Sequence, residues 1–228
     1  MRTELLLGNK AMGKLKNSTV CIFGIGGVGS YVVEGLARSG IGNIILVDYD
    51  TIDITNINRQ LHANFNTIGK KKTEVMKERI VSINPKCNVT TYDECLTKEN
   101  INKLIDVKYD YVVDAIDMVS SKLELIVKCK SMKMPIISCM GTGNKLFPTM
   151  LKVNDIYETY NCPLAKVMRK ELRKRGIDKL TVVWSDEKLI KSNLIDEKTG
   201  KNVPGTISTV PSVAGLIIAS LVIKDLIR

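Results

Sequence analysis

The sequence predicts a doubly wound α/β fold, in which a parallel sheet carries helices on both faces. Short apolar runs alternate with segments whose apolar residues recur every three or four positions, as far as residue 139. This alternation is typical of β-α-β units with right-handed crossovers. The first apolar run also ends in a glycine-rich loop that opens a helix. With 228 residues, 44% of them hydrophobic and 25% charged, the chain is long enough to bury one sizeable core.

The elements of the first 140 residues follow from these two periodicities. Gly40 ends the second predicted helix, and Asn84-Pro85 ends the third. The segment over 48–68 is polar and has no strong period, so we expect it to be irregular. In chain order, we predict a helix over 3–16 with Leu5, Leu6, Ala11, Met12 and Leu15 at its apolar positions, a strand over 19–23, a helix over 28–39, a strand over 43–47, a helix between Gly69 and residue 84, a strand over 89–92, a short helix around 101–105, a strand over 111–115, a helix over 119–133 and a strand over 135–139.

The rhythm changes after Gly141, and a C-terminal extension of mixed strands and helices follows. We predict strands over 150–153 and 181–185, a helix around 163–175 between them, and a mobile loop over about 187–206. The apolar run over 213–223 is about half the ~20 residues that span a bilayer, so we predict a buried or docking helix and no integral membrane segment. The expected organisation is a nucleotide-binding core over 1–145, with 146–228 completing the same domain.

Charge and cysteine usage narrow the class of protein further. The formal net charge is +10 and the isoelectric point is about 9.3, which favours a polyanionic partner such as nucleic acid, a nucleotide or an anionic surface. The six cysteines form no C-x-x-C pair, which excludes the spacing of a zinc ribbon. The N-terminal residues lack an apolar core of signal-peptide length. We therefore expect a cytoplasmic protein with reduced thiols.

The glycine-rich loop predicts a nucleotide site in a Rossmann-like sheet. Gly24-Ile25-Gly26-Gly27-Val28-Gly29-Ser30 follows the first predicted strand and matches G-x-G-x-x-G in the required context. Glycines let the backbone approach phosphate oxygens, and the helix N-terminus offers free N–H groups to the anion. Asp48 falls 19 residues after Gly29, where a carboxylate can accept from a ribose hydroxyl. The motif alone leaves open NAD, ATP or a tight turn without a ligand.

The polar side chains that follow favour a triphosphate. Arg59 can place its guanidinium on phosphate oxygens, and Lys72 can add a point charge. Asp117 comes just past the fourth strand, and a carboxylate facing phosphates implies a bridging Mg²⁺. Each residue has an ordinary alternative, because Arg59 and Lys72 could be solvated surface charges and Asp117 could cap the next helix.

Together these residues resemble the ThiF/MoeB/ubiquitin-activating enzyme superfamily of adenylating enzymes. The resemblance covers roughly residues 1–140 and is strongest to the branch that dehydrates N6-threonylcarbamoyladenosine in tRNA. The shared marks are Gly24–Ser30, Asp48-x-Asp50, Asn56-x-x-Arg59-Gln60, Gly69-x-x-Lys72 and Asp114-x-x-Asp117. Stretches similar to that branch are Arg2–Gly8, Gly40–Gly42, Asn58–Ala63 and Glu78–Pro85, with a weaker likeness over Pro163–Arg173 and Val210–Ser212.

The resemblance implies a reaction, its cofactors and its partners. ATP would activate the threonyl carboxylate as an acyl-adenylate, and the carbamoyl group would then attack the activated carbonyl, so that a ring closes with net loss of water. Residues 1–145 would be the ATP-binding adenylation core. ATP, Mg²⁺, tRNA bearing threonylcarbamoyladenosine and a second copy of the chain in a homodimer are implied. Docking of a sulfur-transfer partner protein, as in some relatives, stays open.

The same resemblance assigns roles to residues. Asp117, Arg59, Lys72 and Arg2 would be catalytic, with Asp117 holding the metal and Arg2 reaching the phosphates of the neighbouring subunit. The residues implied in nucleotide binding are Gly24, Gly26, Gly27, Gly29, Asp48, Asp50, Asn56, Arg59, Gln60 and Lys72.

A basic segment in the extension is a candidate RNA contact. Lys166, Arg169, Lys170 and Arg173 share one face of the predicted helix over 163–175. Such a face can follow a phosphate backbone. The alternative is a solvated helix face, which the residues alone would favour.

Cys162 and His62 have ordinary and functional interpretations. Ubiquitin-type activating enzymes use a cysteine that forms a thioester, and Cys162, just before Pro163, is the candidate for that role in this chain. A structural thiol is the commoner role. His62 is the sole histidine and follows the predicted site residue Gln60, so it could act in catalysis, in binding or in structure.

Three other functions stay open. An adenylating enzyme for a small ubiquitin-like sulfur-carrier protein would need a groove for a Gly-Gly tail. A dinucleotide-dependent oxidoreductase would bind NAD or NADP. A non-catalytic RNA-binding module would keep the fold but not turn over ATP.

Overall fold

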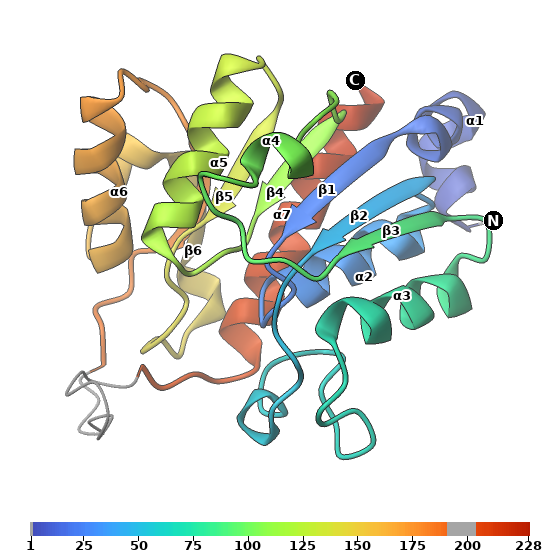
Figure 1. Ribbon diagram of the computed structural model, residues 1–228, viewed down its shortest axis with the longest axis horizontal. Helices are drawn as coiled ribbons and strands as arrows, with labels where there is room; N and C mark the ends of the chain where they lie inside the picture. The colour runs from blue at the N-terminus through green and yellow to red at the C-terminus, as the bar shows by residue number, and fades with distance from the viewer. Residues whose placement is uncertain (1, 191–203) are drawn as a thin grey trace.

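A computed structural model describes residues 2–190 and 204–228 and confirms the doubly wound α/β fold (Figure 1). One seven-stranded sheet runs in the order β3-β2-β1-β4-β5-β7-β6. The strands are β1 (Thr19–Phe23), β2 (Asn43–Val47), β3 (Asn88–Tyr92), β4 (Tyr111–Asp114), β5 (Ile136–Cys139), β6 (Leu151–Asp155) and β7 (Thr181–Ser185). The helices are α1 (Arg2–Asn17), α2 (Gly29–Ser39), α3 (Lys72–Ile83), α4 (Ile101–Leu104), α5 (Val119–Ser131), α6 (Pro163–Lys174) and α7 (Thr209–Ile227).

The sheet separates two apolar clusters, one on each face. One cluster joins the sheet to α1, α2, α3 and α7, and the other joins it to α4, α5 and α6. Because β1 and β4 lie in the middle of the sheet, helices cover both of their faces, which explains their continuous apolar runs.

The C-terminal extension adds its strands to the same sheet. β7 pairs in parallel with β5, and β6 pairs antiparallel with β7 at the edge. β6 precedes β7 in the chain yet lies outside it, so sequence order alone does not give the order of these two strands.

The register aligns the carboxyl ends of the central strands. Phe23 of β1 pairs with Val47 of β2 on one side and with Asp114 of β4 on the other. The loops that leave β1, β2 and β4 therefore start at one edge of the sheet. Ligands bind at this edge in open α/β sheets.

The expected apolar face of the first helix is wrong in its N-terminal half. Met12 and Leu15 are buried, but Leu5 is 86% exposed and Leu6 82% exposed. Gly8 lies between the two halves with φ of 79°, so the helical phase breaks there. The sequence prediction assumes one continuous helical periodicity over residues 3–16 and therefore misses this break.

The long apolar run forms α7, which packs on α2 and the sheet. By length and composition α7 could cross a membrane, since its mean hydropathy is 1.9, and 39% of that window is buried. Its contact with α2 is close, because a Cβ on Gly215 would lie 2.4 Å from the Val28 carbonyl oxygen and 2.8 Å from Tyr31 Cβ. The prediction of a buried or docking helix is confirmed for the face that carries Ala214, Ile218 and Val222.

This contact predicts a stability effect. Gly215→Ala should lower the free energy of unfolding by about 1–3 kcal/mol, because the new methyl group overpacks the α2–α7 contact. Gly13→Ala is the matched control, since its Cβ would meet nothing within 4 Å. Urea unfolding of both variants checks this, and equal losses would contradict it.

Most of the predicted mobile loop over 187–206 lies outside the described residues. The described ends form neither helix nor strand. Ile190 N donates to the Asn144 carbonyl at 2.9 Å, and Gly205 N donates to Asn144 Oδ1 at 2.7 Å. Asn144 therefore holds both described ends.

Candidate active site

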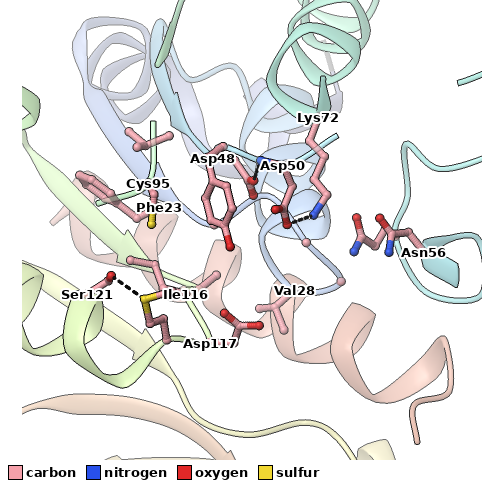
Figure 2. Close-up of a pocket in the computed structure, with 18 of the residues that line it drawn as sticks. Phe23, Val28, Asp48, Asp50, Asn56, Lys72, Cys95, Ile116, Asp117 and Ser121 are labelled. Carbon is pink, nitrogen blue, oxygen red and sulfur yellow. Dashed lines mark hydrogen bonds and ion pairs between the residues drawn. The ribbon is translucent and has the colours of Figure 1, made fainter. Parts of the chain in front are cut away.

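A cavity of about 410 Å³ lies where β1, β2 and β4 end (Figure 2). The sequence analysis predicts the glycine-rich loop and the polar site residues at this edge of the sheet. The loops after β1, β2, β3 and β4 and the starts of α3 and α5 contribute its walls, and Thr142 and Pro211 complete the lining. The lining includes ten residues of the sequence prediction: Gly24, Gly26, Gly27, Asp48, Asp50, Asn56, Arg59, Gln60, Lys72 and Asp117.

The glycine loop turns too tightly for larger residues. Gly24 has φ of 86°, and a Cβ there would lie 2.7 Å from the Ala115 carbonyl oxygen. A Cβ on Gly29 would lie 1.8 Å from the Gly24 carbonyl oxygen. Gly26 and Gly27 line the cavity, whereas Gly29 closes the turn behind them. The bare backbone of this loop leaves room for a bulky anion at the start of α2.

Asp48 ties the glycine loop to the end of β2. Its Oδ2 accepts from Ile25 N at 2.5 Å, and its Oδ1 accepts from Asp50 N at 2.9 Å. Burial raises the pKa of Asp48 from its ordinary value, and the charge of Lys72 opposes that rise. Each oxygen keeps a second lone pair, so the carboxylate can also accept from hydroxyl groups of a ligand.

Lys72 is a buried cation in the cavity wall. Its ammonium pairs with Asp50 Oδ2 at 2.6 Å, and Figure 2 shows this pair. Lys72 is only 4% exposed, whereas the side chain of Asp50 is 44% exposed. The alternative that Lys72 is a solvated surface charge is therefore wrong. A phosphate that entered the cavity could share the ammonium with Asp50.

Arg59 lies over the glycine loop. A Cβ on Gly27 would meet Arg59 Cγ at 3.3 Å. The guanidinium donates to the Thr55 carbonyl and to Asn58 Oδ1, both at 2.9 Å. The side chain is half-buried, and its remaining donors can reach an anion above the loop.

Asn56 and Gln60 flank Arg59 and also line the cavity. Asn56 forms a capping box with Asp53, which fixes the short 3₁₀ turn Ile54–Asn56. Gln60 Oε1 is buried and has no hydrogen-bond partner within the described ranges. Since buried acceptors are normally satisfied, Gln60 marks a place for a donor that a ligand or water would supply.

Asp117 lies across the cavity from Asp50 and Lys72 (Figure 2). Its carboxylate is exposed and has no hydrogen bond or ion pair to any residue that the structure describes. The alternative that it caps α5 is wrong, because Met118 takes the cap position and Asp117 donates or accepts nothing there. Asp117 is thus free to act on a ligand.

The chemistry of Asp117 suits a nucleotide-borne Mg²⁺. Within residues 2–190 and 204–228, no group of three or more His, Cys, Asp or Glu side chains could hold a metal ion. Mg²⁺ does not need such a cage, because it is usually bound by one or two carboxylates together with substrate phosphates and water. The single free carboxylate fits that pattern.

The sequence prediction missed one wall of the cavity. Ser121 Oγ donates to the Leu96 carbonyl at 2.6 Å, which joins α5 to the loop after β3. The residues of this wall are Glu94, Cys95, Leu96, Met118 and Ser121. The position of Cys95 and Leu96, just past a strand end, was the available signal.

Several predicted functional residues lie outside the cavity lining. Arg2 is exposed at the start of α1 and does not line the cavity of its own chain. Cys162 is 4% exposed at the start of α6, as expected for a structural thiol. His62 is 3% exposed, and neither ring nitrogen has a partner among the described residues. Burial, together with the charge of Lys72, lowers the pKa of His62 to about 4, so its imidazole is neutral at pH 7.

The basic residues of α6 are separate from the cavity and differ in their contacts. Lys166 and Lys170 are exposed. Arg169 donates to Thr159 Oγ1, and the Arg173 guanidinium lies 4.9 Å from the centre of the Tyr157 ring. The two lysines are therefore the freer cations on this face.

Known proteins similar to this chain include tRNA threonylcarbamoyladenosine dehydratases. The chain matches the ThiF family over residues 2–228. It is 44% identical over 238 aligned residues to the tRNA threonylcarbamoyladenosine dehydratase of Bacillus subtilis (strain 168), an alignment that covers 100% of this chain and 94% of that protein. Its structure resembles E. coli tRNA N6-threonylcarbamoyladenosine dehydratase in complex with AMP, at a TM-score of 0.91 and 37% identity, over 99% of this chain and 92% of that one. For the complex of the E. coli enzyme with ATP, the TM-score is 0.90 and the sequence identity is 36%, again over 99% of this chain and 92% of that one.

Proposed function

This chain belongs to the ThiF family, and we propose that it is an ATP-dependent dehydratase that closes a ring on N6-threonylcarbamoyladenosine in tRNA. The observation that carries the proposal is the likeness over 99% of the chain to a dehydratase solved with ATP. The cavity at the carboxyl edge of the sheet supports it independently, because it combines a glycine loop with two cations and a free carboxylate.

In this proposal, each wall of the cavity has a role toward ATP. The loop after β3 and the start of α5 receive the base, and Asp48 accepts from the ribose hydroxyls. The glycine loop, Asn56, Arg59 and Lys72 surround the phosphates. Gln60 Oε1, which has no partner within the described ranges, accepts from the ligand or its water shell. Asp117 would hold Mg²⁺, which neutralises charge on the phosphates when it is bound.

The chemistry asks for positioning and charge neutralisation more than for a protein nucleophile. A carboxylate is a poor electrophile, because its leaving group would be oxide. Adenylation replaces that leaving group with AMP, and the carbamoyl group of the same nucleoside then attacks. Arg59 and Lys72 stabilise the charge that develops as pyrophosphate and then AMP depart. Neither Cys162 nor His62 is needed for these steps.

The alternatives have less support. A sulfur-carrier activator shares the adenylation site, but the likeness of the whole chain is to dehydratases. An oxidoreductase has little use for Arg59 and Lys72 at the phosphate end of the cavity. A non-catalytic RNA-binding module gives no role to the buried Lys72 or to Asp117, which has no partner among the described residues.

We extend the proposal to a homodimer. The first turns of α1 expose Leu5 and Leu6 at 86% and 82%, and a second copy of the chain would cover them. Arg2 lies on the same turn and does not line the cavity of its own chain. In a dimer it could reach the phosphates of the partner.

We also propose that the enzyme acts in the cytoplasm. All six cysteines are free in the structure, and five of them are buried. Reduced thiols are typical of that compartment.

The test of the proposed function is a mass analysis of tRNA nucleosides. Threonylcarbamoyladenosine-bearing tRNA is incubated with the protein, ATP and Mg²⁺, and then digested. We expect the modified nucleoside to lose one water, and only when ATP is present. No change with folded protein would contradict the proposal and favour the sulfur-carrier activator, which pyrophosphate exchange with candidate carrier proteins would then test.

The basic face of α6 is the proposed tRNA contact and gives a second test. Lys166→Gln with Lys170→Gln should weaken tRNA binding and reduce the slope of log K against log salt by about 1.4–1.8, because two phosphate contacts are lost. Lys77→Gln with Lys86→Gln is the control, since both lysines are exposed on and after α3 and the charge change is equal. Binding titrations over a series of salt concentrations measure both pairs, and equal slopes would refute the assignment.

A further inference from the structure

Lys122 is a fully buried lysine behind the loop that carries Asp117. Its side chain is 0% exposed, and it extends from the first turn of α5 back toward the sheet. The ammonium donates to the Ile116 carbonyl and to the Cys139 carbonyl, each at 2.8 Å, and pairs with Asp114 Oδ2 at 2.9 Å. An ammonium has three donors, so these contacts use all of them.

Asp114, the partner of Lys122, is equally committed. Its side chain is 0% exposed and ends β4. Oδ1 accepts from Ile116 N at 3.1 Å, and Oδ2 accepts from Ser138 Oγ of β5. Ile116 therefore has its N–H held by Asp114 and its carbonyl held by Lys122. The next residue in the chain is Asp117.

The turn between β4 and α5 has a further contact with the glycine loop. A Cβ on Gly24 would lie 2.7 Å from the Ala115 carbonyl oxygen, so the two loops are in close approach. A shift of this turn would move Asp117 and disturb the glycine loop together. The Lys122–Asp114 pair fixes the turn at both polar groups of Ile116, immediately before the free carboxylate.

Stability alone is a weak reason for this ion pair. Burying two charges has a large desolvation penalty, and apolar replacements of buried ion pairs are often neutral or stabilising. We propose that Lys122 is a positioning residue, which acts through Ile116 to hold Asp117 at the nucleotide. This inference rests on the proposed role of Asp117 and names the residue on which that role depends.

The test removes both charges at once. Lys122→Met alone would leave Asp114 buried without its cation and could prevent folding. The pair Lys122→Met with Asp114→Asn keeps the shape, and the new amide retains an acceptor for Ile116 N and a donor for Ser138 Oγ. Lys130→Met is the matched control, because Lys130 is an exposed lysine on the same helix. Thermal unfolding confirms that each protein is folded.

The decisive measurement is a cycle of ATP dissociation constants in the presence of Mg²⁺. Four proteins are titrated by calorimetry: the natural chain, Asp117→Ala, the paired variant, and the paired variant with Asp117→Ala. We expect Asp117→Ala to weaken binding about tenfold in the natural chain and less than about twofold in the paired variant, since coupled residues are non-additive. The Lys130→Met control should match the natural chain.

Two results would overturn the positioning role. One is an equal effect of Asp117→Ala in both backgrounds. The other is no effect of Asp117→Ala in the natural chain, because Lys122 would then have nothing to position. If the paired variant does not fold, Ser138→Ala supplies the same cycle, since it removes one contact of Asp114 and leaves both charges; equal effects of Asp117→Ala with and without it overturn the role as well. The readout is nucleotide affinity, so a failure to dehydrate tRNA would contradict the proposed function separately.

Discussion

Replacing Asp117 with Ala is expected to lower ATP-dependent turnover about 10²–10³-fold, the usual loss when one group that stabilises developing charge is removed. We expect the variant to fold normally. Asp117 is exposed and has no hydrogen bond or ion pair to a described residue, so the free energy of unfolding should change by no more than about 0.5 kcal/mol. The loss then reports on chemistry and not on folding.

The measurement is pyrophosphate release with threonylcarbamoyladenosine-bearing tRNA, with tRNA binding titrated in parallel. Binding should survive, since the proposed RNA contact lies on α6. Asp106→Ala is the control, because Asp106 is exposed and does not line the cavity. Turnover at the natural rate in Asp117→Ala would refute the assignment of this carboxylate to the phosphates and their metal.

The part of the site that the sequence predicts is the part encoded by local patterns. The glycine loop, Asp48 and Asp117 each follow an apolar run that predicts a strand. Parallel strands have their carboxyl ends at one edge of the sheet, so these residues come together there. The register of β1 with β2 and β4 then makes neighbours of loops that are far apart in the chain. Fold class and most of the lining follow from this reasoning.

The remainder depends on contacts between distant segments. The Ser121–Leu96 hydrogen bond joins α5 to the loop after β3, and no periodicity in the sequence indicates that these two segments meet. Lys122 looks like an ordinary helix lysine in the sequence and is fully buried in the structure, where it contacts Asp114 and the carbonyls of Ile116 and Cys139. Its role can be recognised only from the folded structure, because its three acceptors come from β4, from the turn after β4 and from β5. The prediction that Leu5 and Leu6 lie on the buried face of the first helix is wrong for a related reason, because Gly8 interrupts the helical periodicity.

Lys72→Met should have the second large effect, a fall in kcat/KM of about 10²-fold or more, because a buried cation beside the proposed phosphate site is lost. Lys72 is 4% exposed and pairs with Asp50 at 2.6 Å, so its charge acts in a poorly solvated wall. Lys71→Met is a close control. Lys71 is the preceding residue, its side chain is 49% exposed, and it pairs with Asp93; neither residue lines the cavity.

The same variant should change the pH dependence of ATP binding in a direction fixed by Asp48. Burial already raises the pKa of Asp48, and the charge of Lys72 is what limits the rise. The ionised carboxylate is the form that accepts from ribose hydroxyls, so affinity should fall as the pH drops through this pKa. Without Lys72 the pKa of Asp48 rises further, and the acid limb of the affinity profile should move to higher pH.

Stability should respond to the same change with a defined sign. A carboxyl group whose pKa is raised in the folded state contributes its stability below the unfolded pKa and loses it as the pH rises through the folded pKa. Lys72→Met should therefore be more destabilising at neutral pH than near pH 4. Lys77→Met should show no such trend, because Lys77 is exposed and has no ion pair to a described residue. Calorimetric affinities and urea unfolding between about pH 4 and 8 test both statements, since this range extends upward from the usual Asp pKa. An acid limb that stays in place in Lys72→Met would mean that Asp48 does not accept the nucleotide in its ionised form.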